Sequence, residues 1–478
     1  MNTIQRIAKN TGVLIIAQIV GHSLAFFYGA YTARYLGAES FGILSFGLAF
    51  TGIFGVFTNL GLGSLTVREV ARDKSLASKY LGNIVVIKFI LAIVVFGLIV
   101  LTINLLGYPE QTMKVVYLLA LSIICKGFGG VFGSIFNAYE KMEYNSIGQI
   151  LNSSLMLGGV LFAINQRFNV VGFAFLYFIV SAISLIYSFV ICVLKFAKPK
   201  IEVDWLFWKR TIKEALPFGL ALAFVTTFYW ISSVMLSLMK GDVVVGWYNA
   251  AYRIVLFLLF IPNTFISSLY PVMARFYIKS EDSLRYSFEK SLQYLTLLAL
   301  PLGVGTTLLA PRLIFRIFGP EYTNSIGALQ ILIWSTVFIF MSQPFGNLFN
   351  CLNKQSIVTK ITAICLGLNV IINLMLIPKY GLIGASIATV FTEFTSLTLS
   401  FIWSLRIGYG ILKKEFADFL IKVLISSALM GIFVLFFQNL TLWILVPFAA
   451  LFYFIILYVI RGITKEDIYL FRRIIVEK

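Results

Sequence analysis

The sequence predicts an all-α, polytopic membrane protein with 14 transmembrane helices, in two pseudo-symmetric six-helix lobes followed by two C-terminal helices. Its 478 residues have a mean hydropathy of +0.93 and only 12% charged residues, whereas soluble proteins carry about 25%. Apolar runs of about 20 residues, each long enough to cross a bilayer, recur along the chain. A short phrase also occurs twice, 213 positions apart.

The repeated phrase marks two halves of the chain. Residues 134–141 read S-I-F-N-A-Y-E-K, and residues 347–354 read N-L-F-N-C-L-N-K. The glycine pair of residues 37 and 42 also returns 204 positions later, at residues 241 and 246. Internal repeats in a transporter usually surround one central site. Both copies of the phrase lie at cytoplasmic span ends, which predicts parallel repeats about an axis along the membrane normal.

The apolar segments predict the spans in order along the chain. They lie at 11–36, 42–67, 82–107, 112–138, 144–165, 169–194, 213–239, 244–274, 286–311, 322–350, 355–377, 381–407, 416–438 and 440–461. The last two spans have no counterpart in the first half. We therefore expect an N-terminal lobe over 1–208, a C-terminal lobe over 209–412, and an appended helix pair with a cytoplasmic tail over 413–478.

The distribution of Lys and Arg predicts the orientation. With a cytoplasmic N-terminus, 28 of the 38 Lys and Arg residues fall in cytoplasmic loops and tails, and six fall outside. Cytoplasmic loops carry this kind of excess. We expect both termini to be cytoplasmic and the protein to lie in the cell (plasma) membrane, with the first span retained. The net charge of +18 then reports topology and attraction to anionic lipid, and nucleic acid is not an expected partner.

The longest cytoplasmic connection, residues 196–212, joins the two lobes. It combines four basic residues with Trp205 and Trp208. This composition is typical either of a short interfacial helix or of an ordinary charged linker with tryptophans at the headgroups.

The acidic residues exclude several enzyme classes. Glu393 alone among 20 acidic residues lies deep in a span, so no carboxylate cluster is available to hold Mg²⁺ against a lipid phosphate. The sequence also contains no phosphate-binding loop of the form G-x-x-x-x-G-K-[ST]. We expect no cofactor, no metal and no catalytic residue.

Lys126 is one of two cations predicted at bilayer depth. A charge there costs about 2.5–3.5 kcal/mol on insertion scales, so it needs a partner or a wet cavity. Lys126 shares a helical face with Ser122, Gly133 and Asn137. It either lines a cationic cavity or donates to carbonyl groups at a helix contact.

Arg253, the second cation, lies one turn after Asn249 and beside Tyr252. Its guanidinium either holds phosphate with two parallel hydrogen bonds or fixes a helix kink. A net-positive cavity suits an anionic cargo, such as a lipid diphosphate that carries sugars. We expect Arg253, Lys126, Asn249 and Tyr252 to contact this cargo.

Four other ionisable residues also lie within predicted spans. Arg34 closes the first span near the outer surface, and we include it among the cargo residues. Lys88 lies close enough to the cytoplasmic end of its span to snorkel to the interface. His22 and Glu393 lie near the middle of their spans, and both are candidates for ion coupling. Glu393 is alternatively a structural partner of a lysine.

Four short stretches resemble one transporter family. They are T-A-R-Y-L-G-A-E-S-F-G at 32–42, G-W-Y-N-A-A-Y-R-I at 246–254, F-G-P-E-Y at 318–322 and I-P-K-Y-G-L-I-G-A-S-I-A at 377–388. In order and spacing they resemble the polysaccharide-transporter family, the O-antigen and exopolysaccharide flippases of the multidrug/oligosaccharidyl-lipid/polysaccharide (MOP) exporter superfamily. The resemblance implies two lobes around a cleft. Arg34 and Arg253 fall within the matching stretches.

The resemblance also implies a function. It indicates a non-enzymatic flippase that moves a polyprenyl-(di)phosphate-linked oligosaccharide from the inner to the outer leaflet by alternating access. The expected partners are this cargo, membrane lipid, and a glycan polymerase or glycosyltransferases of the same pathway. A cation-coupled multidrug exporter of the same fold stays open, although such exporters carry an acidic residue in the first span and this chain does not. A polytopic glycosyltransferase or polysaccharide polymerase and a lipid scramblase also stay open.

Overall fold

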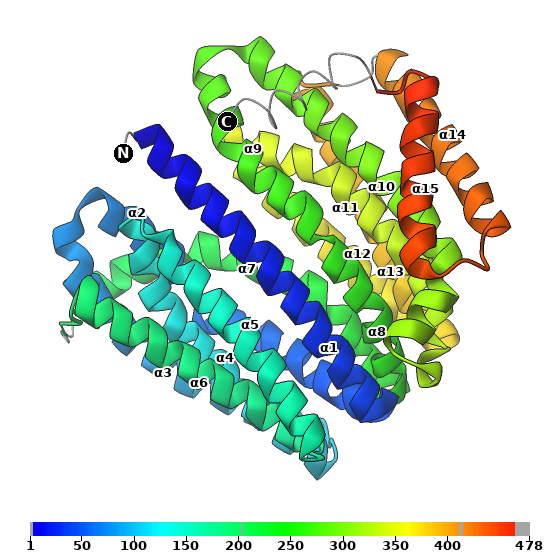
Figure 1. Ribbon diagram of the computed structural model, residues 1–478. Helices are drawn as coiled ribbons and strands as arrows, with labels where there is room; N and C mark the ends of the chain where they lie inside the picture. Colours follow the sequence, from blue (N-terminus) through cyan, green and yellow to red (C-terminus); the bar gives the residue numbers. More distant parts are fainter. Residues whose placement is uncertain (1–2, 201, 203, 411–413, 464–478) are drawn as a thin grey trace. The chain divides into compact units, whose positions relative to one another are not determined.

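The computed structural model describes residues 3–200, 202, 204–410 and 414–463, and this part of the chain is almost entirely helical and contains no strand (Figure 1). Thirteen of its segments are long and apolar enough to cross a membrane. The first of them is 42 residues long and holds two predicted spans, because a non-helical glycine, Gly37 (φ 74°, ψ 174°), divides it. The fold class is therefore confirmed.

The helices follow the predicted order. They are α1 (Thr3–Gly55), α2 (Leu62–Arg72), α3 (Ala77–Leu105), α4 (Glu110–Ala138), α5 (Met142–Asn165), α6 (Val170–Lys195), α7 (Trp205–Lys240), α8 (Asp242–Leu258), α9 (Phe260–Lys279), α10 (Glu281–Ile317), α11 (Ser325–Cys351), α12 (Gln355–Tyr380), α13 (Leu382–Arg406), α14 (Lys414–Phe436) and α15 (Leu442–Val459). Three short 3₁₀ turns join them: η1 (Val56–Thr58), η2 (Lys74–Leu76) and η3 (Pro320–Tyr322).

The predicted span at 42–67 ends earlier than expected. Its helix stops at Gly55, and the chain turns at Leu60 and Gly61 before the short helix α2 begins. A side chain at Gly61 would lie 2.4 Å from the Ala215 carbonyl oxygen of α7. Glycine at this turn therefore allows the backbone to pack directly against α7.

The chain packs as two compact units. One contains Met1–Phe260, Ile317–Asn324 and Thr362–Ala388, and the other contains Ile261–Arg316, Ser325–Ile361 and Thr389–Lys478. These units follow packing, whereas the expected lobes over 1–208 and 209–412 follow the sequence repeat, so the lobe boundaries stay a prediction. In the second unit, Tyr453 of α15 donates to the Leu297 carbonyl of α10 over 2.8 Å, which attaches the C-terminal pair.

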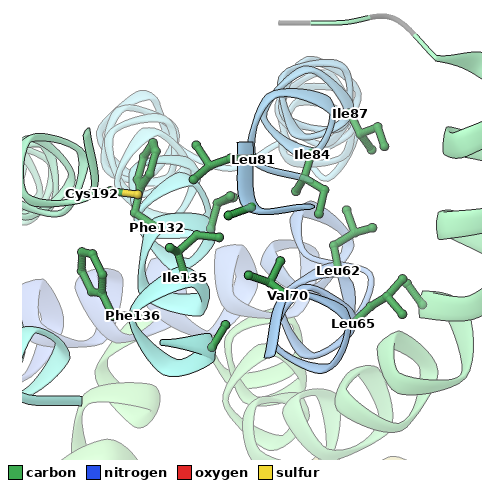
Figure 2. Packing of buried hydrophobic residues seen from close by; sticks show 14 of the residues in the cluster. Leu62, Leu65, Val70, Leu81, Ile84, Ile87, Phe132, Ile135, Phe136 and Cys192 are labelled. Carbon is green, nitrogen blue, oxygen red and sulfur yellow. The ribbon is translucent and has the colours of Figure 1, made fainter. Parts of the chain in front are cut away.

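One end of the first unit is held by an apolar cluster. Figure 2 shows its members from four helices: Leu62, Leu65 and Val70 of α2, Leu81, Ile84 and Ile87 of α3, Phe132, Ile135 and Phe136 of α4, and Cys192 of α6. Trp208 of α7 joins this cluster, and its indole NH donates to Asn83 Oδ1 over 2.8 Å. Residues 205–212 of the predicted connection thus form the N-terminal end of α7, which Trp208 attaches to the cluster.

The first unit also contains a reciprocal contact between the two copies of the glycine pair. A side chain at Gly42 of α1 would lie 1.8 Å from the Asp242 carbonyl oxygen, and one at Gly246 of α8 would lie 1.9 Å from the Ala38 carbonyl oxygen. Gly246 is the repeat counterpart of Gly42, and Asp242 is the counterpart of Ala38, each 204 positions later. Each glycine therefore contacts the counterpart of the other glycine's partner. The sequence repeat is therefore a local two-fold relation in space, and only glycine permits this approach.

Candidate functional site

The guanidinium of Arg253 lies directly on α1. Its Nη1 donates to the Ala25 carbonyl oxygen over 3.2 Å, and its Cζ lies 5.7 Å from the centre of the Phe41 ring. An added methyl at Gly29 would lie 1.2 Å from Nη1. Gly29 therefore provides the space that the cation occupies, and the interior of the first unit surrounds it.

Tyr177 of α6 connects Arg253 with Lys126. The Lys126 ammonium lies 5.9 Å from the centre of the Tyr177 ring, while the Tyr177 hydroxyl is within hydrogen-bonding reach of Arg253. The Tyr28 side chain of α1 also lies within the field of this guanidinium. Four helices thus bring two cations and two tyrosines together, and we call Arg253, Lys126, Tyr177, Tyr28 and Gly29 the cation cluster.

Lys126 is exposed on the surface of α4, and its ammonium lies close to the ring of Tyr177. On the same face of α4, Ser122 is buried and shares a 2.7 Å hydrogen bond with Ser181, whereas Asn137 is exposed. This face is closed at one end and accessible from Lys126 to Asn137, which is the expected cytoplasmic end.

Lys88 does not snorkel as the sequence predicts. It is only 2% exposed, and its ammonium donates to the Gly127 carbonyl oxygen of α4 over 2.6 Å. The carbonyl at the α3–α4 contact satisfies the charge, so the side chain has no need to reach the interface. Lys88 therefore takes the structural role that the sequence left open for Lys126.

Two predicted cargo residues hold helices together. Asn249 shares hydrogen bonds of about 3 Å with Ser233 of α7 and the Val245 carbonyl oxygen. Tyr252 is buried and stacks on Tyr248 with ring centres 5.7 Å apart. The Asn249 side chain thus joins α8 to α7, whereas the Tyr252 ring packs along its own helix, and the contact of both residues with cargo stays a prediction.

The other predicted site residues lie away from the cation cluster or in the second unit. Arg34 is exposed near the end of the first half of α1. His22 is half-buried and follows Gly21, whose backbone packs against Gln149 of α5. Glu393 lies in the second unit, is 7% exposed, and follows the buried Thr392 on α13. Within the described ranges, no three His, Cys, Asp or Glu side chains are grouped to hold a metal ion.

A buried polar group that the sequence reasoning missed joins α7 to α12. Asn373 Nδ2 donates to Ser232 Oγ over 3.1 Å and to Asn369 Oδ1 over 2.7 Å. Tyr177 and Tyr28 were also missed, because aromatic residues fill most of these spans and carry no separate signal. The asparagines, spaced four residues apart in an apolar span, were a usable signal.

Comparison with known proteins agrees with this fold. The family model described as "Polysaccharide biosynthesis protein" matches residues 7–277, and the MatE model matches residues 217–375. The probable low-salt glycan biosynthesis flippase Agl15 of Haloferax volcanii is 21% identical over 386 residues, which are 80% of each chain. A putative O-antigen transporter of Shigella flexneri is 26% identical over 383 residues, 75% of this chain and 88% of that protein.

Among solved structures, the lipid II flippase MurJ in an inward closed conformation has the same fold. Its TM-score is 0.75 at 16% identity, with 95% of this chain and 99% of MurJ covered. The spans make this chain a multi-pass membrane protein. Because the first family model matches more than half of its length, the chain belongs to the polysaccharide biosynthesis protein family.

Proposed function

We propose that this protein is a flippase that moves a lipid-linked oligosaccharide from the inner to the outer leaflet for the synthesis of surface polysaccharide. The relatives named as glycan flippases and O-antigen transporters support this cargo class and a transport role without catalysis. The observation that carries the proposal for this chain is the cation cluster. Placing two cations within membrane-spanning helices costs free energy. Binding of an anionic cargo with a lipid tail would give these charges a function.

The cation cluster suits a phosphate or diphosphate link. Arg253 presents several N–H donors in a fixed plane, a geometry that matches phosphate oxygens. Lys126 adds a point charge 5.9 Å from the centre of the Tyr177 ring. The cargo would approach along the accessible face of α4 from Lys126 to Asn137. The glycan would lie along this face while the lipid tail stays in the bilayer.

Transport would follow alternating access, with the cytoplasmic side loaded first. We place both termini in the cytoplasm and the protein in the plasma membrane, on the Lys and Arg distribution. Arg34 would meet the cargo during its exit. His22 and Glu393 are the proposed ion-coupling residues, because each is an ionisable group inside a span. Glycosyltransferases and a polymerase of the same pathway are the proposed partners.

Reconstitution tests the cargo and the cluster together. Purified protein in liposomes should move a fluorescent polyprenyl-diphosphate oligosaccharide between leaflets, and Arg253→Ala or Lys126→Ala should slow this movement at least tenfold. Lys209→Ala is the matched control, because Lys209 is an exposed cation near the start of α7 and outside the cation cluster. Equal rates in all three variants would contradict the assignment of the cation cluster to cargo.

A multidrug exporter is the second candidate. The MatE family model, which matches residues 217–375, favours it. The cationic character of the Arg253–Lys126 pair disfavours cationic drugs, which would be repelled. Resistance to cationic dyes on expression, with no movement of the lipid-linked glycan, would support the exporter and reject the flippase.

A further inference from the structure

Two loops of the first unit place tyrosine hydroxyls on the ends of two repeat-related helices. The η3 turn carries Tyr322, whose hydroxyl donates to the Ala33 carbonyl oxygen of α1 over 2.6 Å. The loop between α3 and α4 carries Tyr108, whose hydroxyl shares a 2.9 Å hydrogen bond with Ser237 Oγ of α7. Ala33 and Ser237 are 204 positions apart, the offset that also relates Gly42 to Gly246. The two tyrosines therefore contact corresponding positions in the two halves, Tyr322 through a backbone carbonyl and Tyr108 through a side-chain hydroxyl.

Glu321 adds a second connection beside Tyr322. Its Oε1 accepts the Ala38 amide of α1 over 2.9 Å, and its carbonyl oxygen accepts the Trp247 indole NH of α8 over 3.0 Å. Because Gly37 interrupts α1, the Ala38 amide is at a helix start and has no partner within its helix. A carboxylate is favourable at this position. One residue thus ties the second half of α1 to α8.

The contact between α1 and α8 is a direct backbone contact at the end near Tyr322. At Gly42 and Gly246 the two backbones meet, and the centre of the Tyr322 ring lies 6.3 Å from that of the Phe41 ring of α1. Further along α8, Arg253 crosses to α1 and donates to the Ala25 carbonyl oxygen. The hydrogen bonds of Glu321 and Tyr322 therefore add to the backbone contact at the glycine end of the seam. Burial raises the pKa of the Tyr322 hydroxyl and of the Tyr108 hydroxyl above the ordinary tyrosine value, so both stay protonated at cellular pH.

We propose that Tyr322, Glu321 and Tyr108 are gating residues that latch the α1–α8 seam shut at the outer end of the protein, and that their release opens the outward path for cargo. The word "outer" and the cargo rest on the function proposed above. The latch itself depends only on contacts within the first unit. Tyr322 and Glu321 form hydrogen bonds to α1 on either side of its interruption at Gly37. Tyr108 forms a hydrogen bond to the corresponding end of α7.

Cysteine accessibility tests the latch without cargo. The background for the test is a chain whose four cysteines are replaced by serine. In it, Ala250→Cys places a thiol one turn after Gly246 on the same face of α8. The native Ala250 is fully buried. A membrane-impermeant maleimide applied to intact cells then reports opening from outside. One hydrogen bond shifts such an equilibrium about fivefold. Tyr322→Phe and Tyr108→Phe should each raise the labelling rate about fivefold, because phenylalanine keeps the ring packing.

Glu321 provides a matched pair of variants. Glu321→Gln keeps an oxygen that accepts the Ala38 amide, so labelling should stay near the parent rate, whereas Glu321→Ala should raise it like Tyr322→Phe. Unchanged labelling in Tyr322→Phe, Tyr108→Phe and Glu321→Ala would overturn the latch. Labelling only in inside-out vesicles would overturn its outer position.

The two proposals fail in different ways. Labelling does not require cargo, so a wrong cargo leaves the accessibility result intact. Conversely, Lys126→Ala, which removes a cation of α4 rather than a contact between α1 and α8, should slow cargo movement while leaving the labelling rate unchanged. Denatured, detergent-solubilised samples labelled to completion give the amount of protein in each membrane, so a variant that fails to fold is recognised by its low total signal.

Discussion

Gly29→Ala should separate the stability of this protein from its transport activity. The new methyl would lie 1.2 Å from Arg253 Nη1, and non-bonded heavy atoms rest at about 3.5 Å, so the guanidinium must withdraw by about 2 Å. This movement breaks the 3.2 Å hydrogen bond to Ala25. It also moves the guanidinium away from the position proposed for the cargo phosphate. A hydrogen bond from a charged donor to that phosphate is worth about 1.5–3 kcal/mol, so its loss corresponds to a transport rate about 10- to 100-fold lower.

The fold should tolerate the same substitution. The clashing atom is the end of a flexible side chain, and the preference for alanine over glycine within a helix, about 1 kcal/mol, offsets part of the lost Ala25 hydrogen bond. The liposome assay gives the rate, and the amount of protein in the membrane gives the stability. Gly12→Ala is the control, because a methyl there meets nothing within 4 Å. In an Arg253→Ala background, Gly29→Ala should cost nothing further. A normal rate for Gly29→Ala alone, or an additional loss in the double variant, would refute the reasoning.

Three further predictions concern packing and pH. Gly246→Ala places a methyl 1.9 Å from a backbone oxygen and should reduce the folded protein in the membrane severalfold, unlike Gly97→Ala, which meets nothing within 4 Å. Asn83→Ala leaves the buried Trp208 indole without its acceptor and should lower the free energy of unfolding by about 1–3 kcal/mol, measured by thermal melting in detergent. Hydrogen bonds from the Phe207 amide and Lys79 lower the pKa of the Asp204 carboxyl. Its stabilisation is therefore present above about pH 4 and lost as the pH falls through the lowered pKa. The melting-temperature difference between the wild type and Asp204→Asn should be present at about pH 6 and disappear by about pH 3.

Hydropathy predicted the order of the spans but not where each of them ends. The interruption of α1 lies at Gly37, where the sequence placed a loop. The turn at Leu60 and Gly61 was missed because its cause, the backbone contact with Ala215, joins residues far apart in the sequence. A hydropathy average over consecutive residues contains no such information.

The sequence predicted the charged residues of the candidate site, because a charge within a membrane span is unfavourable, but it did not predict the uncharged ones. Lys126 and Arg253 stood out because an apolar span discourages cations, and the structure brings both to Tyr177. The same argument could not tell Lys88 from Lys126, since a nearby carbonyl is visible only in three dimensions. The polarity of Asn249 suggested a contact with cargo, but its side chain is already satisfied by a hydrogen bond to Ser233 of α7.

The reciprocal contact of Gly42 and Gly246 bears on how this chain arose. In a homodimer with two-fold symmetry, one surface patch meets its own copy, and each contact occurs twice with the partners exchanged. The contact of Gly42 with Asp242, returned by Gly246 with Ala38, has that form inside a single polypeptide. A gene of half the length would encode a subunit able to pair with itself across this glycine. Fusion of two such copies would let each half change independently, and the chain has this asymmetry: Arg253 lies at one side of the seam, whereas the corresponding position 49 is an alanine.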